Sequence, residues 1–194
     1  MSAPDPIAQF AQWYAKARAS EIDKPHAMAL STVAADGRPS CRMVLLSSFD
    51  ERGFVFHTNY DSRKAEEIAR NNRVTLTFWW DPLGYQVRIE GPAEKTTGAE
   101  SDAYFARRPR GSQLGAWASD QSRPMENRAT LEQRMRDFEE QFKNQAVGRP
   151  PHWGGYRVVP HAIEFWRHRD DRLHERMRYD RDSAGAWRTV LLAP

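Results

Sequence analysis

The feature that most constrains the fold is a series of short apolar segments separated by turn sequences, present at both ends of the chain. Residues 26–33 and 41–49 flank the sequence AADGRPS, whose Asp36-Gly37 dipeptide is typical of hairpin turns. Further strand candidates cover residues 54–59, 73–80, 85–97, 156–160, 162–168, 175–182 and 186–194. Because most connections are short, these strands are expected to pair as antiparallel neighbours.

Helical segments interrupt this pattern of strands. In residues 5–20, apolar side chains recur with helical spacing at Ile7, Phe10, Trp13 or Tyr14, and Ala17. Helices are also expected over residues 62–71, 98–108 and 126–142, whereas 109–124 is expected to be irregular and 148–155 a loop. Since strands occur at both ends of the chain, the last ones are expected to complete the sheet begun by the first. The predicted fold is mainly β, an antiparallel barrel with peripheral helices.

The charge and composition of the chain argue against a nucleic-acid partner and against a membrane-spanning segment. The chain has 29 basic and 26 acidic residues, a formal net charge of +3, and signs that are interspersed along most of its length. A nucleic-acid-binding protein more often has a concentrated basic tract, so no nucleic-acid partner is expected. No apolar run is long enough to cross a bilayer, and MSAPDPIAQF lacks the basic segment and apolar core of a secretory signal.

The cysteine content indicates the compartment. Cys41 is the only cysteine, so the chain can form no intramolecular disulfide. A reducing, cytoplasmic location without a membrane partner is therefore expected. Because Cys41 lies in an apolar run, it is expected to be a buried and unreactive thiol.

The start of the 62–71 helix carries an unusual charge pattern. Asp61 or Ser62 suits the N-cap, yet the first turn holds Arg63 and Lys64. The helix macrodipole is already positive at this end, where acidic residues are favoured by roughly 0.3–1 kcal/mol each. A bound phosphate would explain the pattern, because backbone N–H groups, the dipole and two cations would converge on one anion.

Arginines beside small hydroxyl residues recur in three clusters, SRK at 62–64, RRPRGSQ at 107–113 and RLHER at 172–176. Guanidinium groups bind phosphate through paired hydrogen bonds, although a single cluster of this kind is more often a solvated surface. His174 taken alone is more often a packed or surface histidine than a catalyst, and Trp166 is more often core. The six histidines are scattered without metal-ligand spacing, so no metal site is expected.

Longer motifs carry a resemblance to a known family. They are GRPSCRMVLLSSFDERGFVFHTNYDSRKAEEIA, YQVRIEG, ESDAYFARRPRGSQLGAWASDQS, PPHWGGYRVVPHAIEFW and RLHERMRYDRD. In this order, from about residue 27 to the C-terminus, the chain resembles pyridoxine/pyridoxamine 5′-phosphate oxidase. The resemblance implies an FMN-binding split barrel that works as a homodimer, with FMN at the subunit interface. Residues 1–26 then form an N-terminal helical segment, and 27–194 form one barrel domain that includes C-terminal dimerisation strands.

The resemblance also implies site residues. Arg63 and Lys64 match residues that bind the FMN phosphate. The full set of expected FMN contacts is Arg42, Met43, Val44, Leu45, Leu46, His57, Thr58, Arg63, Lys64, Gln86, Gln121, Ser122, Trp166 and Arg176. Expected substrate contacts are Ser47, Tyr104, Arg108, Ser112, Arg172 and His174, of which Arg172 and His174 are also the expected catalytic pair.

The implied reaction is the oxidation of a phosphorylated pyridine. Flavin takes a hydride from C4′ of pyridoxamine or pyridoxine 5′-phosphate and passes two electrons to O₂, giving pyridoxal 5′-phosphate and H₂O₂. Tyr104, Arg108 and Ser112 match the residues that hold the substrate phosphate, which aligns the reacting carbon from a distance.

The chain departs from the family pattern at three positions. Ser47 stands where a lysine normally reaches the substrate phosphate, His57 where tyrosine is common, and Ala65 where glycine usually follows SRK. Two alternatives therefore stay open. One is a split-barrel flavoprotein that acts on a different substrate, and the other is a non-catalytic protein that binds FMN or pyridoxal phosphate.

Overall fold

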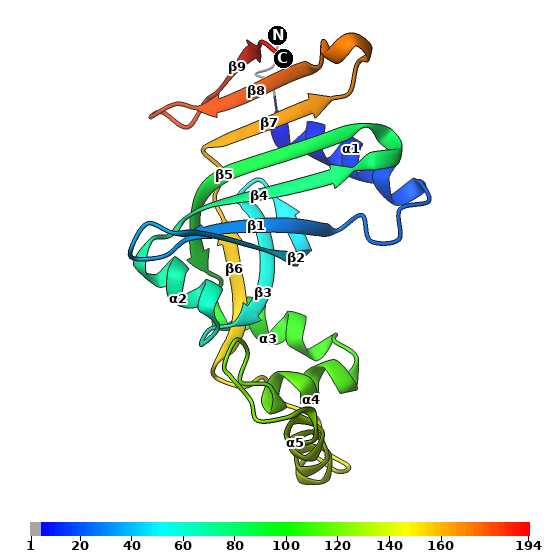
Figure 1. The fold of residues 1–194 in the computed structure, drawn as a ribbon, viewed down its shortest axis with the longest axis vertical. Helices are drawn as coiled ribbons and strands as arrows, with labels where there is room; N and C mark the ends of the chain where they lie inside the picture. The colour runs from blue at the N-terminus through cyan, green and yellow to red at the C-terminus, as the bar shows by residue number, and fades with distance from the viewer. Residues whose placement is uncertain (1–4) are drawn as a thin grey trace.

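Nine antiparallel strands form the body of the protein in the computed structural model, which describes residues 5–194 (Figure 1). Six of them close a barrel in the order β4-β1-β2-β3-β6-β5, because β5 pairs with β4 as well as with β6. The remaining three extend from β5 in the order β7-β8-β9. The strands are β1 (Ala27–Val33), β2 (Pro39–Asp50), β3 (Gly53–Asn59), β4 (Arg73–Trp80), β5 (Tyr85–Lys95), β6 (Trp153–Val158), β7 (Ala162–Arg167), β8 (Glu175–Arg181) and β9 (Trp187–Leu192).

Residues 5–194 also form five α-helices, which lie beside the barrel or at its end. Figure 1 shows an elongated molecule with β7, β8 and β9 at one end, the barrel in the middle and α3, α4 and α5 at the other end. The helices are α1 (Pro6–Ala19), α2 (Arg63–Arg70), α3 (Gly98–Ala106), α4 (Arg110–Ala118) and α5 (Arg128–Gln141), with short 3₁₀ turns at Asp81–Leu83 and Asp170–Arg172.

The barrel is split because two long strands change partners along their length. The first part of β2 pairs with β1 as far as Leu45, and after a bulge between Leu46 and Ser48 its second part pairs with β3. In β5, residues up to Pro92 pair with β4, and from Ala93 the strand pairs with β6. The predicted fold class, an antiparallel split barrel with peripheral helices, is confirmed.

Helix α1 packs its apolar face into the barrel core. Phe10 is fully buried, with ring centroids 4.8 Å from Phe54 and 5.2 Å from Phe78. Asp5 caps the helix by accepting a hydrogen bond from the N–H of Ile7 at 2.9 Å. Burying a side chain of this size contributes about 1.5–3 kcal/mol, which ties the N-terminal segment to the barrel. Residues 1–4 of the predicted 1–26 segment lie outside the described residues.

The prediction that residues 109–124 are irregular is wrong, because α4 occupies the first half of this segment. Ser112 and Gln113 donate backbone hydrogen bonds to the carbonyl of Pro109 at 2.8 and 3.0 Å and so begin the helix. Leu114 is buried in a second apolar cluster with Phe105 of α3, with Val147 and with Trp153 of β6. Tertiary packing of this kind stabilises a short, glycine-containing helix that has little stability of its own.

Strand β6 begins inside the segment predicted to be a loop. Gly154 and Gly155 lie in the strand, where other parts of the chain approach the backbone closely. A Cβ atom on Gly154 would be 2.1 Å from the hydroxyl of Tyr60, and one on Gly155 would be 2.5 Å from Oγ1 of Thr96. The glycines therefore serve close packing rather than a turn.

The prediction that Cys41 is buried is also wrong. Side chains along the first half of β2 alternate between the barrel and solvent, and Cys41 falls on the outer face. Met43 and Leu45 share that face and are 64% and 48% exposed. The run of apolar residues in β2 therefore supplies side chains to both faces of the strand, one in the core and one facing outward.

Candidate functional site

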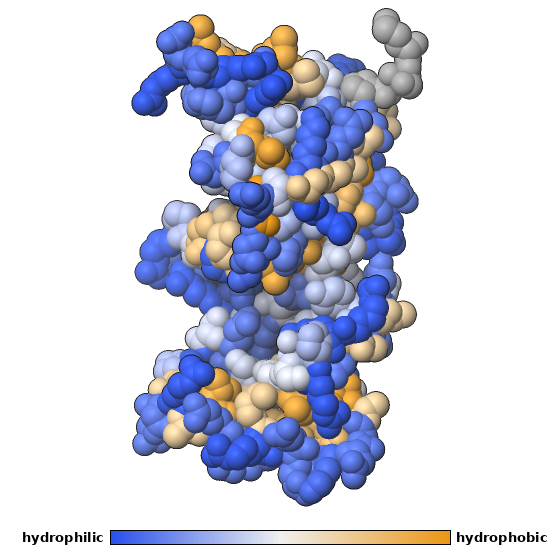
Figure 2. Space-filling model, turned by 90° about the vertical axis from the view of Figure 1, so that its right-hand side faces the viewer, coloured by the Kyte–Doolittle hydropathy of each residue, from blue (hydrophilic) through white to orange (hydrophobic). Residues whose placement is uncertain are grey.

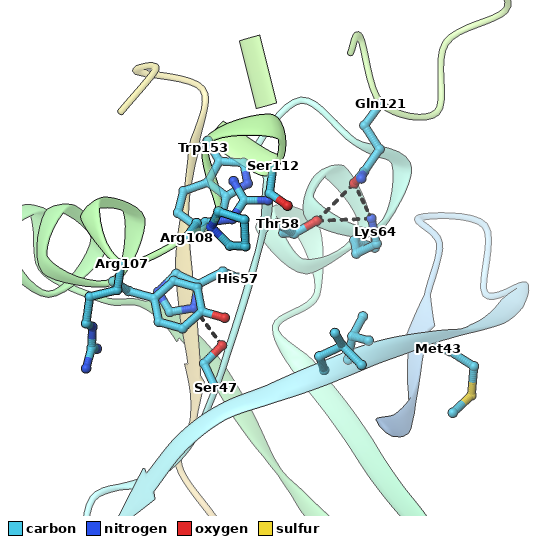
Figure 3. Close-up of a pocket in the computed structure, with 14 residues that line it drawn as sticks. Met43, Ser47, His57, Thr58, Lys64, Arg107, Arg108, Ser112, Gln121 and Trp153 are labelled. Atoms are coloured by element: carbon cyan, nitrogen blue, oxygen red, sulfur yellow. Dashed lines mark hydrogen bonds between the residues drawn. The ribbon is translucent and has the colours of Figure 1, made fainter. Parts of the chain in front are cut away.

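A cavity of about 490 Å³ opens where β2 and β3 meet the helices α2, α3 and α4 (Figure 3). It collects side chains that are far apart in the sequence, most of them able to donate hydrogen bonds. It is lined by Met43, Val44, Leu45, Ser47, His57, Thr58, Lys64, Tyr104, Arg107, Arg108, Pro109, Ser112, Gln121 and Trp153.

Lys64 is the buried cation of this cavity. Its Nζ donates to Oε1 of Gln121 at 2.6 Å, to Oγ1 of Thr58 at 3.1 Å and to Oγ of Ser62 at 3.2 Å. Burial, reinforced by the charge of Arg42, lowers the pKa of Lys64 to about 8. The charge of Glu67 acts in the opposite direction, but no carboxylate among residues 5–194 is ion-paired with Lys64, so the position suits a phosphate.

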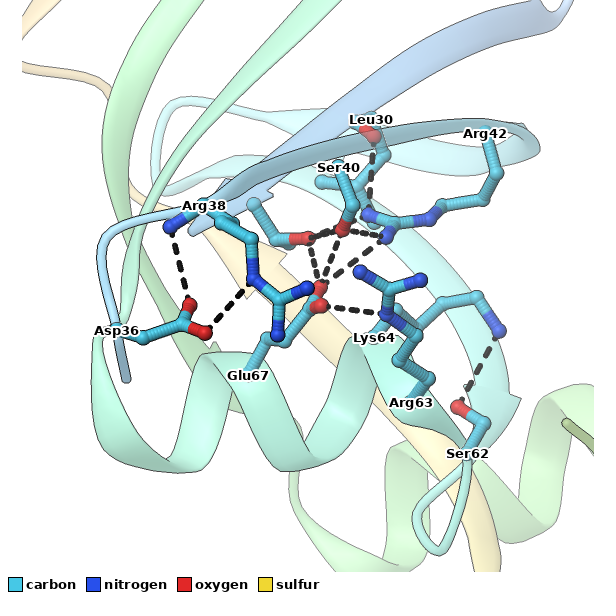
Figure 4. A network of polar contacts seen from close by, with 10 residues as sticks. Leu30, Asp36, Arg38, Ser40, Arg42, Ser62, Arg63, Lys64 and Glu67 are labelled. Carbon is cyan, nitrogen blue, oxygen red and sulfur yellow. Dashed lines mark hydrogen bonds and ion pairs between the residues drawn. The ribbon is translucent and has the colours of Figure 1, made fainter. Parts of the chain in front are cut away.

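Arg63, the other cation of this helix start, faces a buried carboxylate (Figure 4). Its Nε donates to Oε1 of Glu67 at 2.8 Å, while Nη2 of Arg42 and Oγ of Ser40 reach Oε2 at 3.1 and 2.6 Å. Thr32 also donates to Oε2. One carboxylate thus fixes both Arg42 and Arg63, two of the expected FMN contacts that do not line the cavity.

The charge state of Glu67 follows from these contacts. Burial by itself raises the pKa of Glu67, but hydrogen bonds from Ser40, Thr32 and Arg63 and the charge of Arg42 outweigh it and lower the pKa to about 2.

Ser62 is the N-cap residue of α2, as predicted, although its hydroxyl donates to the carbonyl of Asn59 instead of capping the helix.

Aromatic rings and an arginine form the opposite part of the cavity. The ring of Tyr104 stacks on His57 with centroids 3.9 Å apart, and the guanidinium of Arg108 lies 4.5 Å from the ring centroid of Trp153. Ser47 and Nδ1 of His57 are hydrogen-bonded at 2.8 Å. Burial first, and then the charges of Arg108 and Arg107, lower the pKa of His57 to about 4, so this imidazole is neutral at pH 7.

Arg108 has an unused donor. Its Nη1 is buried and has no hydrogen-bond partner among the described residues, and burial lowers the pKa of this guanidinium. A buried guanidinium N–H without an acceptor is costly, and an anion in the cavity would satisfy it. Ser112, near the start of α4, lines the same cavity and offers a hydroxyl.

The remaining expected site residues gather at the other end of the molecule, around β7 and β8. Gln86 pairs with Trp166 across β5 and β7, and the ring of Trp166 lies 4.5 Å from that of His174. Arg176 donates to Oε1 of the buried Glu164 at 2.8 Å, and this hydrogen bond raises its pKa. Arg172 is exposed in a 3₁₀ turn with a positive φ of 60°.

The structure therefore divides the expected site residues into groups. Most line the cavity, whereas Arg42 and Arg63 bind Glu67, Leu46 is buried, and Ser122 lines a neighbouring cavity beside α5. The group near β7 and β8 is Gln86, Trp166, Arg172, His174 and Arg176. None of these five lines the first cavity.

Four residues of the site were not predicted. Arg107, Pro109 and Trp153 line the cavity, and Glu67 fixes the two arginines. Arg107 belongs to the arginine cluster at 107–113, and Glu67 follows Arg63 by four residues, a spacing that pairs charges on a helix. These signals were present in the sequence, whereas Trp153 was hidden in a segment expected to be a loop.

The surface carries exposed apolar residues in addition to the cavity. Figure 2 shows a mostly hydrophilic face on which separate apolar patches occur at several levels of the molecule. The large apolar side chains with the highest exposure include Leu191 at 76%, Leu173 at 68% and Met43 at 64%. Within residues 5–194, no group of histidine, cysteine or acidic residues is placed to hold a metal ion, and no helix is long and apolar enough to span a membrane.

Comparison with known sequences identifies relatives of the whole chain. The profile of the family described as pyridoxamine 5′-phosphate oxidase matches residues 15–142, and that of the pyridoxine 5′-phosphate oxidase C-terminal dimerisation region matches residues 153–194. A pyridoxine/pyridoxamine 5′-phosphate oxidase of Rubrobacter xylanophilus is 56% identical over 98% of this chain and 88% of its own length. A protein of the same name from Nostoc punctiforme is 52% identical over 98% of this chain and 89% of its own.

Solved structures agree with the fold. PhzG from Burkholderia lata 383, solved with tetrahydrophenazine-1-carboxylic acid, superposes with a TM-score of 0.92 and 35% identity over 98% of this chain and 93% of its own. An FMN-binding protein related to pyridoxamine 5′-phosphate oxidase, from Nostoc punctiforme, has a TM-score of 0.79 at 16% identity and supports the fold alone. By its sequence and its structure, the chain belongs to the pyridoxamine 5′-phosphate oxidase family.

Proposed function

We propose that the protein is an FMN-dependent oxidase that converts pyridoxamine 5′-phosphate and pyridoxine 5′-phosphate into pyridoxal 5′-phosphate, with O₂ reduced to H₂O₂. The observation that carries the proposal is one cavity with two separate sets of phosphate donors. Lys64, held in place by Thr58 and Gln121, forms one set, and Arg108 and Ser112 form the other. The names of the relatives with more than half of their residues identical support the same reaction.

The first donor set fits the phosphate of FMN. Lys64 presents a charge-assisted donor that the oxygens of Thr58 and Gln121 hold in place, and Arg42 and Arg63 are ion-paired with Glu67 on the same helix start. FMN held here would supply the redox chemistry of the reaction, namely uptake of a hydride from C4′ of the substrate and two-electron reduction of O₂. Water then releases ammonia from the oxidised amine substrate, whereas the alcohol substrate gives the aldehyde directly.

The second donor set holds the substrate phosphate. Arg108 supplies the unpartnered guanidinium N–H, Ser112 and Ser47 supply hydroxyls, and Tyr104 flanks them. Because this phosphate lies far from C4′, its binding energy serves to align the reacting carbon. The two donor sets thus give separate places to the two phosphates.

The complete site needs two copies of the chain. We infer a homodimer in which Gln86, Trp166 and Arg176 of one protomer complete the FMN site of the other, with Arg172 and His174 as catalytic residues beside the substrate ring. This inference is supported by the match of residues 153–194 to a dimerisation region and by the distance of the five named residues from the cavity of their own chain.

A cytoplasmic location is part of the proposal, because the sole cysteine is exposed and unpaired.

The exposed apolar side chains support the same inference. Met43 and Leu45 line the cavity from the outer face of β2, and Val190 and Leu191 are exposed on β9. A partner that covers these side chains would remove them from water and form the missing wall of the cavity.

Turnover under air tests the proposal directly. The FMN-loaded protein is expected to form pyridoxal 5′-phosphate and H₂O₂ in equal amounts from pyridoxamine 5′-phosphate, over many cycles per flavin. Absence of turnover at millimolar substrate with FMN bound would contradict it. Turnover on any physiological substrate would also exclude a purely cofactor-binding role.

A different substrate is the second candidate, and Ser47 is the observation that favours it. This part of the cavity offers a neutral hydroxyl where the family resemblance leads one to expect a lysine. The related PhzG was solved with a tricyclic carboxylic acid and not with a phosphorylated pyridine. Introducing Lys at position 47 separates the two candidates. A sharp rise from negligible activity on pyridoxamine and pyridoxine 5′-phosphates in Ser47→Lys would favour the second candidate. High activity of the wild-type protein on these substrates would favour the first.

A further inference from the structure

Ser47 and His57 form a hydrogen-bonded pair on adjacent strands of the cavity wall (Figure 3). The Oγ of Ser47 lies 2.8 Å from Nδ1 of His57. The imidazole is held by its neighbours, because its ring stacks nearly parallel to Tyr104 at 3.9 Å and to Trp153 at 5.2 Å. The direction of the hydrogen bond decides whether the Ser47 hydroxyl offers a proton or a lone pair to the cavity.

The imidazole of His57 carries only one proton. Burial is the largest cause of its lowered pKa, and Arg108 and Arg107 of the loop after α3 act in the same direction. Glu100 of α3 raises the pKa but does not reverse the result. A neutral imidazole has one N–H donor and one lone-pair acceptor, so the two ring nitrogens take opposite roles.

The surroundings of Nε2 indicate which nitrogen is protonated. This atom is buried and has no hydrogen-bond partner among the described residues. It packs toward Gly155, where a Cβ atom would come within 3.0 Å of it. A buried N–H without an acceptor is rarer in proteins than an unpaired acceptor, and the nearby cations Arg107 and Arg108 favour a lone pair at this position. The proton therefore belongs on Nδ1.

We propose that His57 is a positioning residue for the substrate phosphate: it donates its Nδ1–H to Ser47 and so commits the Ser47 hydroxyl to donate into the cavity. There the hydroxyl joins Arg108 and Ser112 on the same phosphate. The inference rests on the proposed function and deepens it, since it names a neutral, hydrogen-bonded hydroxyl as the third phosphate donor. With the opposite tautomer, Ser47 would present lone pairs and repel the same anion.

A double-mutant cycle on the FMN-loaded protein tests this pair. The probe is 4-deoxypyridoxine 5′-phosphate, which has no oxidisable group at C4′, and its binding is followed by the flavin absorbance change. Ser47→Ala removes one hydrogen bond to the charged phosphate. The affinity of this variant for the probe is therefore expected to be about 10-fold lower than that of the wild-type protein. His57→Phe keeps the stacked ring and removes the donor, and it is expected to weaken binding several-fold in the wild-type background but not in the Ser47→Ala background.

The unphosphorylated compound, 4-deoxypyridoxine, is the matched control. Its affinity is expected to stay the same in all four proteins, because the pair acts only on the phosphate. Tighter binding of the phosphate ester to His57→Phe would overturn the proposal, as would an equal loss in both backgrounds. Oxidation of pyridoxamine 5′-phosphate by the wild-type protein is measured alongside, so failure of the proposed function is distinguished from failure of the pair.

Nitrogen-15 NMR of the histidine side chains gives a second measurement that needs no variant at the pair. His57 is expected to show a protonated Nδ1 and an unprotonated Nε2 at pH 7, before and after addition of the probe. A protonated Nε2, either in the opposite tautomer or in an imidazolium, would overturn the proposal even if His57→Phe did not fold.

Discussion

Single residues in this protein carry charge states that their contacts explain. Lys64 is the clearest case, because burial lowers the pKa of its ammonium group to about 8, well below the ordinary value for lysine. The folded protein without cofactor therefore loses this proton at a lower pH than the unfolded chain does. Its stability rises with pH across the interval from about 8 to the ordinary lysine pKa, since the unfolded chain binds more protons there.

The same cation should control FMN affinity. Replacing Lys64 by Met removes a charge-assisted hydrogen bond of about 1.5–3 kcal/mol, so the Kd for FMN is expected to rise roughly 10- to 100-fold. In the wild-type protein the affinity should fall as pH rises above about 8, as the ammonium group loses its proton. Quenching of flavin fluorescence measures both effects. Lys64→Arg is the control, because a guanidinium stays charged and should remove the pH dependence.

The charged form of Glu67 stabilises the fold, whereas the charged form of Lys64 destabilises the protein without cofactor. Its pKa of about 2 in the folded protein lies below the ordinary glutamate value, so ionised Glu67 stabilises the fold by about 3 kcal/mol above the unfolded pKa. This stabilisation is lost as pH falls through the interval from about 4.5 to 2. Urea unfolding of Glu67→Gln is expected to show a loss of about 2–3 kcal/mol at pH 7 and a weaker dependence on acid.

The neighbouring glutamate provides the control for this prediction. Glu66 is half-exposed and pairs with the exposed Arg123, an arrangement that contributes about 0–1 kcal/mol. Glu66→Gln should therefore change the free energy of unfolding much less than Glu67→Gln. Equal effects of the two substitutions would contradict the role assigned to the buried carboxylate.

At the level of secondary structure, the sequence predicted the elements whose signals are local. The strands on either side of Asp36-Gly37 and the helix from Ser62 were placed correctly, because turn chemistry and helical spacing act over a few residues. Helix α4 and the start of β6 were not, since Leu114 and Gly154 take their conformation from distant parts of the chain. The candidate site followed the same rule, because the contact of Glu67 with Arg42 joins segments 25 residues apart.

Close backbone contacts between elements give a prediction about glycine. A Cβ atom on Gly91 of β5 would lie 2.0 Å from the carbonyl oxygen of Val159, a backbone atom that cannot move aside without shifting the chain. Gly91→Ala is expected to lower the free energy of unfolding by about 3 kcal/mol. A Cβ atom on Gly115 of α4 would meet nothing within 4 Å beyond the adjoining helix backbone, so Gly115→Ala should stabilise the helix by about 0.5–1 kcal/mol. Thermal unfolding of both variants checks the contrast, and similar melting temperatures would contradict it.

For the whole molecule, the main consequence of the fold is that one chain separates the expected site residues. The cavity with Lys64 and Arg108 lies beside α2 and α3, whereas Trp166 and His174 lie on and after β7, toward the opposite end of the molecule (Figure 1). The family resemblance predicted a site at a subunit interface. The spacing of apolar and turn residues within one chain carries no information about such an interface. A two-fold dimer would bring the two groups together twice.

Complementation between two inactive variants tests this arrangement. Arg108→Ala should abolish substrate binding in the cavity, and Arg172→Ala should remove a residue that the partner contributes. Each homodimer is expected to be nearly inactive, whereas random mixing of the two chains should restore about a quarter of the wild-type sites, because half of the dimers are mixed and each of these has one intact site. If each chain held a complete site of its own, the mixture would stay inactive.

An anaerobic titration of the purified yellow protein with pyridoxamine 5′-phosphate tests the central claim most directly. We predict that the flavin absorbance bleaches in proportion to added substrate, that it returns when air is admitted, and that one pyridoxal 5′-phosphate appears for each flavin reduced. A protein that binds no FMN, or one whose bound flavin keeps its absorbance in excess substrate, would contradict the claim.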